Sequence, residues 1–121
     1  MDLKSLVFLR SSRADLKNFP REVQHVMGYA LQVAQEGGKH PDAKPLKGFH
    51  GAGVLEVIED FEGDTYRAVY TVRYEEAIYV LHAFQKKSRS GIATPQREIT
   101  LLKERLKRAE ELHAQHIVGR R

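Results

Sequence analysis

The fold class is decided by one stretch of the chain, YRAVYTVRY at residues 66–74. Aromatic and β-branched residues alternate along it with a period of two, which predicts a β-strand. One face carries Tyr66, Ala68, Tyr70, Val72 and Tyr74, and the other carries Arg67, Val69, Thr71 and Arg73. Glu75 and Glu76 form a tight connection, so residues 77–86 are expected to return as an antiparallel strand. This hairpin brings Tyr66 and Arg67 close to Gln85 and Lys86.

Weaker signals on both sides of the hairpin complete an α+β pattern. Apolar runs predict further strands, and apolar residues at spacings of three and four predict helices. A hydroxyl cap followed by proline, Thr94-Pro95, predicts the start of a C-terminal helix. The expected elements are strands at 6–9 and 54–60, helices at 12–18, 20–36 and from 95 to about 115, and a Gly- and Pro-rich loop at 39–53. We therefore expect two N-terminal helices packed on a small, mainly antiparallel sheet, followed by a C-terminal helix.

Length and composition limit the class of protein. With 121 residues the chain is expected to be a single domain, residues 1–121, large enough to bury a core. The absence of cysteine excludes disulfides and thiolate chemistry. No stretch approaches the roughly 20 apolar residues of a membrane span, so we expect a soluble, cytoplasmic protein that makes no contact with a membrane.

The formal net charge of +4 is unevenly distributed along the chain. Residues 1–50 carry a net charge of +3, residues 51–76 carry −5, and residues 77–121 carry +6. Such segregation favours partners of opposite charge, whereas the alternative is a set of solvated helix faces that happen to be basic.

The densest group of candidate functional residues is basic. Arg67 and Arg73 share one strand face, and Lys86, Lys87 and Arg89 leave the end of the neighbouring strand. A guanidinium beside ammonium groups suits a phosphate, since it combines bidentate hydrogen bonds with positive charge. The alternative is a solvated sheet edge on which lysines prevent pairing with another sheet.

The histidines have two interpretations. His82 alternates with Val80 and Phe84, so all three are expected to face one side of the sheet. It is either an acid or base near neutral pH or, as we favour, a hydrogen-bonded core histidine. His113 and His116 are three residues apart on a helix, but no third ligand is indicated, so no metal site is expected.

The carboxylates of the acidic middle do not predict a metal site either. They run along a single strand and its turn, whereas Mg²⁺ sites usually collect carboxylates from several elements. A solvated face or a contact with a basic partner is the favoured interpretation. These residues are Glu56, Glu59, Asp60, Glu62 and Asp64.

Five short motifs in this order and spacing resemble the phage-derived Gp49-like (HigB-like) family of the RelE/ParE superfamily of toxins. They are KPLKG at 44–48, LEV at 55–57, YRAVY at 66–70, LHAFQKKS at 81–88 and Thr94-Pro95 opening a charged helix. The resemblance extends over roughly residues 7–109. It implies a compact α+β toxin fold and a cognate antitoxin, commonly a helix-turn-helix (HigA/Xre-like) protein.

The resemblance also implies an activity, the cleavage of mRNA in the ribosomal A site. The RNA 2′-hydroxyl attacks the adjacent phosphate, basic side chains stabilise the developing charge, and neither metal nor cofactor is used. Arg67 matches the phosphate-binding arginine, and Lys86 and Lys87 match basic residues that offset charge or protonate the leaving oxygen. Glu56 and His82 are the two candidates for the general base.

Further basic and polar residues are expected to contact RNA or phosphate. They are Lys47, Arg73, Ser88 and Arg89.

Two alternatives remain within the superfamily. RelE carries basic residues on the strand that precedes the Tyr-Arg motif, whereas residues 55–60 here offer only Glu56, Glu59 and Asp60. This difference favours a non-catalytic toxin that binds DNA gyrase, like the ParE branch, or an inactive member that only binds its antitoxin. In each case we expect the antitoxin to cover part of the basic surface, or to engage the acidic strand, in a salt-sensitive manner.

Overall fold

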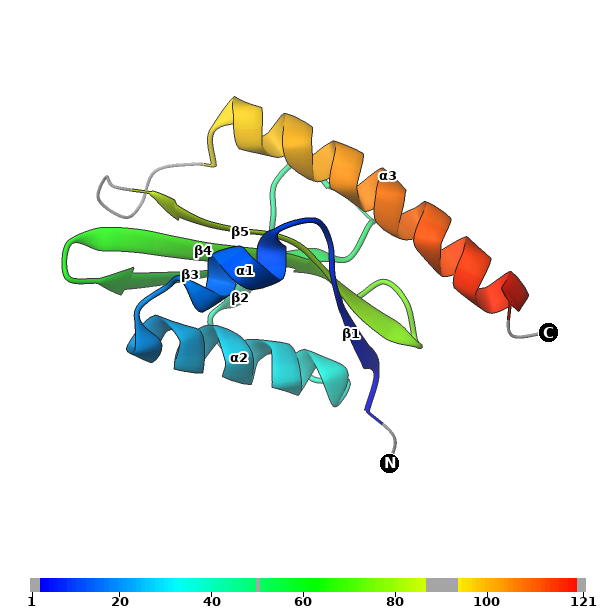
Figure 1. Cartoon of the computed structure of the whole chain (residues 1–121), viewed down its shortest axis with the longest axis horizontal. Coiled ribbons are helices and arrows are strands. Elements are labelled where there is room, and N and C mark those ends of the chain that lie inside the picture. Colours follow the sequence, from blue (N-terminus) through cyan, green and yellow to red (C-terminus); the bar gives the residue numbers. More distant parts are fainter. Residues whose placement is uncertain (1–2, 50, 87–93, 120–121) are drawn as a thin grey trace.

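The computed structural model describes residues 3–49, 51–86 and 94–119, and Figure 1 shows their arrangement. The elements are β1 (Ser5–Phe8), α1 (Ser12–Lys17), α2 (Arg21–Gln35), β2 (Ala43–Pro45), β3 (Val54–Phe61), β4 (Asp64–Thr71), β5 (Ala77–Lys86) and α3 (Gln96–Gly119). The predicted α+β fold, with two N-terminal helices, a mainly antiparallel sheet and a C-terminal helix, is confirmed.

The described strands form a five-stranded sheet in the order β1-β5-β4-β3-β2. β1 pairs with β5 in parallel, and the other pairs are antiparallel. The predicted hairpin is confirmed, since Tyr66 pairs with Gln85 and Arg67 with Phe84. β1 and β2 are therefore the two edges of the sheet, and β4 with its Tyr-Arg motif lies at its centre.

The turn between β3 and β4 has two residues, Glu62 and Gly63, because Phe61 pairs with Asp64. Both turn residues have positive φ, 50° for Glu62 and 87° for Gly63. A two-residue hairpin needs this left-handed geometry to match the twist of the strands, and glycine adopts it without a steric penalty.

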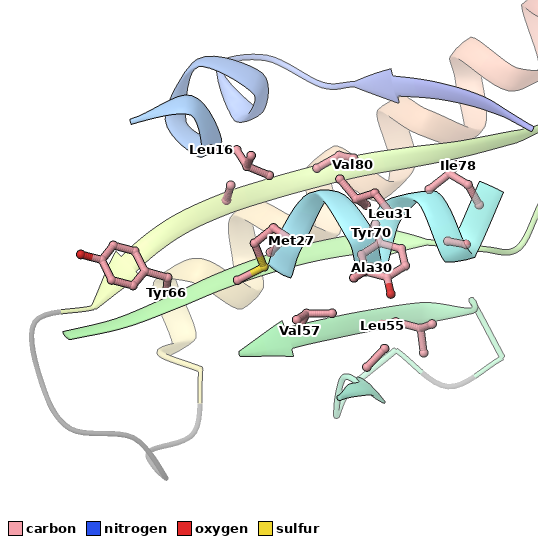
Figure 2. Packing of buried hydrophobic residues seen from close by; sticks show 14 of the residues in the cluster. Leu16, Met27, Ala30, Leu31, Leu55, Val57, Tyr66, Tyr70, Ile78 and Val80 are labelled. Atoms are coloured by element: carbon pink, nitrogen blue, oxygen red, sulfur yellow. The ribbon is translucent and has the colours of Figure 1, made fainter. Parts of the chain in front are cut away.

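Both faces of the sheet are covered, so the core is divided into two clusters. α1 and α2 cover one face, where Met27, Ala30 and Leu31 meet Val57, Tyr70 and Ile78 (Figure 2). α3 covers the other face, where Leu102 and Ala109 meet Val69 and Leu81. In Figure 1 α2 and α3 accordingly lie on opposite sides of the sheet. Because side chains alternate along β4, Ala68 and Tyr70 face α1 and α2, whereas Arg67 and Val69 face α3.

A β-bulge changes the faces of β5. The register between β4 and β5 shifts at Val69 and Tyr70, so that Val69 pairs with His82 and Tyr70 with Val80. Val80 consequently packs in the cluster under α1 and α2, while Phe84 packs in the cluster under α3. The prediction that Val80, His82 and Phe84 share one face is wrong, because the extra residue in the bulge reverses the alternation.

Several element bounds differ from the predictions by one or two residues, and the larger differences concern β2, the end of β4 and α3. The loop predicted at 39–53 contains the short strand β2, which pairs with β3 from Ala43 opposite Val57 to Pro45 opposite Leu55. β4 ends at Thr71 instead of residue 74. α3 begins at Gln96, where the Pro95 carbonyl accepts the bond from Ile99 N at 3.1 Å, and it continues to Gly119. A three-residue edge strand that contains proline has too little alternation to be recognised from sequence.

Candidate functional site

A pocket of about 740 Å³ opens on the face of the sheet that α3 covers. Its walls come from the segment around β2, from β3 and β4, and from the first turns of α3. The described residues that line it are Asp42, Lys44, Pro45, Leu46, Lys47, Gly48, Glu56, Ile58, Arg67, Thr94, Gln96, Ile99 and Lys103.

The least exposed polar side chains of the lining form a network of three. Arg67 Nη1 lies 3.2 Å from Glu56 Oε2 and donates to the hydroxyl of Thr94 at 2.9 Å. Thr94 in turn donates to the same Glu56 oxygen at 2.9 Å. The Arg67 side chain is only 2% exposed and that of Glu56 only 10%. Burial of both charges is tolerable because each has a charged partner and a hydrogen bond.

The register of the sheet explains why Glu56 reaches Arg67. Ile58 lies directly opposite Arg67 on β3, and Glu56 is two residues from Ile58, so it projects from the same face as a diagonal neighbour. The acidic strand thus supplies the partner of the arginine that the sequence singled out.

Thr94 belongs to this network and does not cap α3 with its side chain. Its hydroxyl lies between the guanidinium and the carboxylate, one residue before Pro95. The start of α3 therefore closes over the centre of the sheet at the site. The sequence signal, Thr-Pro before a helix, was present, but it predicted a helix cap.

Lysines surround this network. Lys44, Lys47 and Lys103 line the pocket with exposed side chains, against the single carboxylate of Asp42 beyond the network. Because the charges of Arg67 and Glu56 compensate each other, the net positive charge of the lining comes from these lysines. Lys47, a predicted phosphate contact, lies here, and Lys44 and Lys103, which are not among the predicted site residues, also line the pocket.

His82 lies outside this pocket lining and is enclosed by its own partners. Its Nε2 hydrogen-bonds Glu98, and Arg105 Nη1 donates to its Nδ1 at 3.0 Å. Since an arginine can only donate, Nδ1 is an acceptor, and the ring is the neutral tautomer that donates from Nε2. Burial, and secondarily Arg105, lower the pKa of His82, while Glu98 opposes the shift. This environment is that of a hydrogen-bonded core histidine.

The other predicted basic residues are placed as follows. Arg73 lies beyond the end of β4 and pairs with Glu110 of α3 at 3.0 Å, outside the residues that line the pocket. Lys86 ends β5 opposite Thr65, two positions from the pair of Arg67 with Phe84. Lys87, Ser88 and Arg89 lie outside the described residues, so their placement beside Arg67 stays a prediction.

The C-terminal half of α3 carries a separate polar cluster. His113 is buried, hydrogen-bonds the Tyr79 hydroxyl at 2.9 Å and Glu76 at 3.0 Å, and stacks on Tyr74. Among the described residues no three His, Asp or Glu side chains gather as a metal site would require. No helix in the described part of the chain is long and apolar enough to span a membrane.

Comparisons with known proteins give a family and a fold. Residues 14–107 match the family model described as phage-derived protein Gp49-like. The chain is similar to a free-state double arginine-to-alanine mutant of the Escherichia coli toxin RelE, with a TM-score of 0.50 and 19% identity over 69% of this chain and 82% of that chain. A chain of the RelBE2 toxin–antitoxin complex from Mycobacterium tuberculosis gives a TM-score of 0.47 and 22% identity over 69% and 99% of the two chains. No curated protein matches this chain.

Proposed function

Because the chain belongs to the phage-derived Gp49-like family and has a RelE-like fold, we propose that it is the toxin of a type II toxin–antitoxin module and cleaves mRNA on the ribosome. Its partners would be a helix-turn-helix antitoxin, the ribosome and mRNA. One observation carries the proposal of cleavage: the paired Arg67 and Glu56 lie in a lysine-rimmed pocket beside Thr94.

This arrangement suits cleavage by the substrate's own hydroxyl. In the proposed reaction Glu56 accepts the proton of the ribose 2′-hydroxyl, the 2′ oxygen bonds to phosphorus, and the bond from phosphorus to the 5′ oxygen breaks. Arg67 stabilises the charge that develops on the phosphate oxygens, and Lys86 or Lys87 protonates the leaving 5′ oxygen. The products are a 2′,3′-cyclic phosphate and a free 5′-hydroxyl.

Glu56 is preferred to His82 as the general base. It is the carboxylate beside Arg67 and lines the pocket, whereas both ring nitrogens of His82 already have partners. Substrate phosphate would compete with Glu56 for the guanidinium, which would free the carboxylate to accept a proton.

The dimensions of the pocket also support a nucleotide ligand. A volume of about 740 Å³ is within the range of small-ligand sites. Leu46, Ile58 and Ile99 provide apolar wall for a base, while the lysines provide charge for phosphates.

The test is induced expression of Arg67→Ala and Glu56→Gln, with mapping of mRNA 5′ ends and cleavage on purified ribosomes. Loss of a charge-stabilising donor or a general base lowers the rate by about 100-fold or more. Lys107→Ala, an exposed change on α3 outside the pocket lining, is the matched control and should cleave normally.

The unpaired partner left in either variant is a risk to folding, so the double variant Arg67→Met/Glu56→Gln is included and each protein is checked by circular dichroism. Undiminished cleavage by folded variants would contradict the assignment of these residues.

The acidic β3 favours one second candidate function. Besides the buried Glu56 it carries Glu59 and Asp60, which are not buried, and it has no basic residue, which suits a surface that binds a basic protein. Inhibition of purified DNA gyrase without mRNA cleavage would select a ParE-like, protein-binding toxin. Absence of both activities, with antitoxin binding retained, would select an inactive member.

A further inference from the structure

A second hollow, of about 390 Å³, lies by β1, at the sheet edge opposite to β2. It is formed between β1, the connection that follows it, and α3, and is called the β1–α3 groove below. The residues that line it are Val7, Phe8, Leu9, Arg10, Leu101, Glu104, Arg105, Arg108 and Leu112. None of these residues lines the lysine-rimmed pocket, so the two hollows are separate.

The groove has an apolar centre that α3 leaves partly exposed. Residues 101, 105, 108 and 112 follow one stripe of the helix at spacings of three and four. The neighbouring stripe, with Leu102 and Ala109, is fully buried against the sheet. Leu101, Leu112 and Val7 are half-buried and line the groove, and Leu112 and Val7 also pack against the edge of the cluster under α3. α3 thus has an apolar stripe facing the sheet and a second, partly apolar stripe facing this opening.

Three arginines line this apolar centre, against one carboxylate, Glu104. Arg105 is held in place because its Nη1 donates to the Leu81 carbonyl at 2.9 Å and to His82. Arg108 pairs with Glu111 at 3.5 Å, but both side chains are about half exposed, and such pairs contribute little. Arg10 is exposed and has a φ of 53°, a left-handed conformation that is uncommon for residues other than glycine.

We propose that the β1–α3 groove binds an acidic amphipathic segment of a protein partner. Apolar side chains of the segment would contact Leu101, Leu112 and Val7, and its carboxylates would pair with Arg10 and Arg108. RNA fits less well, because single-stranded RNA is commonly held by stacking on exposed aromatic rings, and Phe8 packs against the core under α1 and α2. The identification of the partner as the neutralising antitoxin rests on the proposed function. The acidic, amphipathic character of the segment is inferred from the groove alone.

The groove leaves the Arg67 site uncovered. An antitoxin that used it would recognise the toxin at β1 and α3, and inhibition would need a second contact or a steric block of the ribosome. Antitoxin binding at the groove and the proposed cleavage at Arg67 would therefore use different residues. Variants of the groove should weaken antitoxin binding without changing cleavage.

The experiment uses the full chain and a synthetic 20-residue probe peptide with leucine at helical spacings of three and four and glutamate at the other positions. Binding is followed by methyl NMR of the chain, with Leu101, Leu112 and Val7 as groove reporters and Ile58 and Ile99 as reporters of the lysine-rimmed pocket. A peptide with lysine in place of glutamate, and a scrambled peptide of the same composition, are the peptide controls. We expect only the acidic amphipathic peptide to shift the groove reporters.

Variants test the role of charge. Arg10→Glu/Arg108→Glu should weaken binding of the acidic peptide by at least about tenfold. Lys107→Glu, an exposed charge reversal on α3 outside the groove lining, should change it by less than about twofold.

Shifts confined to Ile58 and Ile99, equal binding of the scrambled or lysine peptide, or equal loss with Lys107→Glu would each overturn the proposal. So would a single-stranded RNA oligonucleotide that shifts the groove reporters while the acidic peptide does not. Failure of the unmutated chain to cleave mRNA would contradict the proposed function but not this inference. Intact cleavage without peptide binding would contradict this inference alone.

Discussion

Arg67 shows at the scale of a residue how the protein places a charge in its interior. It lies on the central strand β4, and its guanidinium is buried with partners from β3 and from the segment before α3. A buried arginine of this kind is held at one position, whereas an exposed one would sample many rotamers. The pairing with Glu56 therefore preorganises the guanidinium, and in the proposed reaction this would supply the fixed positive charge that electrostatic stabilisation of a phosphate requires.

His82 leads to a prediction of pH-dependent stability. Burial lowers its pKa from the usual 6.5 in the folded chain, so below pH 6.5 the unfolded chain binds the proton more readily than the folded one. The free energy of unfolding should therefore fall as the pH decreases from 6.5 to the folded pKa. Glu98, Arg105 and Asp15 are the charged groups that act on the ring. Urea denaturation at a series of pH values measures the effect.

His82→Gln isolates the histidine from the other titrating groups. Glutamine has an acceptor and a donor for Arg105 and Glu98 but does not titrate. The variant should lose part of the decrease in stability below pH 6.5. Identical pH profiles for His82→Gln and the unmutated protein would show that His82 contributes nothing to the dependence.

At the scale of elements, the hairpins of the sheet are specified locally and the placement of α3 is not. The two-residue turn at Glu62 and Gly63 sets the register of β3 against β4 and so places Glu56 beside Arg67. α3 depends on distant contacts at both ends, with Thr94 before it in the Arg67 network and His113 near its end bonded to Tyr79 and Glu76.

The β3–β4 turn gives a prediction of increased stability. Glu62 has a φ of 50°, which is unfavourable for glutamate, whereas Asn-Gly is the preferred pair for such turns. Glu62→Asn should raise the free energy of unfolding by about 0.5–2 kcal/mol. Gly63→Ala, at a φ of 87°, should lower it by about 1–3 kcal/mol. Chemical denaturation measures both, and a destabilising Glu62→Asn would contradict this interpretation of the turn.

At the scale of the whole molecule, one sheet serves two helix layers. Its faces contribute to separate clusters, one under α1 and α2 and one under α3, and the strands are common to both. We therefore expect the described elements to unfold as one cooperative unit, as is usual for a domain of this size.

Two core variants, one on each face, test this cooperativity. Ile78→Val under α2 should cost about 0.5–1.5 kcal/mol, and Leu102→Ala under α3 about 2–5 kcal/mol. Because the sheet separates the two sites, the double variant should lose the sum to within about 0.5 kcal/mol in a single urea transition. Lys107→Ala should change stability by less than about 0.5 kcal/mol. Two resolved transitions would show instead that α3 unfolds independently.

Much of the fold was predictable because its signals are local. The alternation at residues 66–71 and the helical spacing of Val23, Met27 and Ala30 each reflect the periodicity of one element. The bulge opposite Val69 and the short edge strand at Ala43 were missed, because both depend on pairing with a neighbouring strand.

The candidate site was predictable only in part. Arg67, Glu56 and Lys47 were predicted as site residues and line one pocket. Thr94 was predicted only as a helix cap, and Lys44 and Lys103 were not predicted as site residues, because their contacts come from segments distant in the sequence. The pocket is formed where the segment around β2, the sheet and α3 meet. Local sequence patterns do not predict which distant segments pack together.

By itself, then, the sequence determined the fold class, the central hairpin, the family resemblance and the arginine at the middle of the sheet, because periodicity and motifs act within a few neighbouring residues. Only the tertiary structure decided that Arg67 is buried against Glu56 and Thr94, that His82 is enclosed by Glu98 and Arg105, and that α3 leaves a groove beside β1. The physical reason is that burial, pairing of charges and the shape of a cavity depend on segments far apart in the chain, which meet only when the sheet and helices pack.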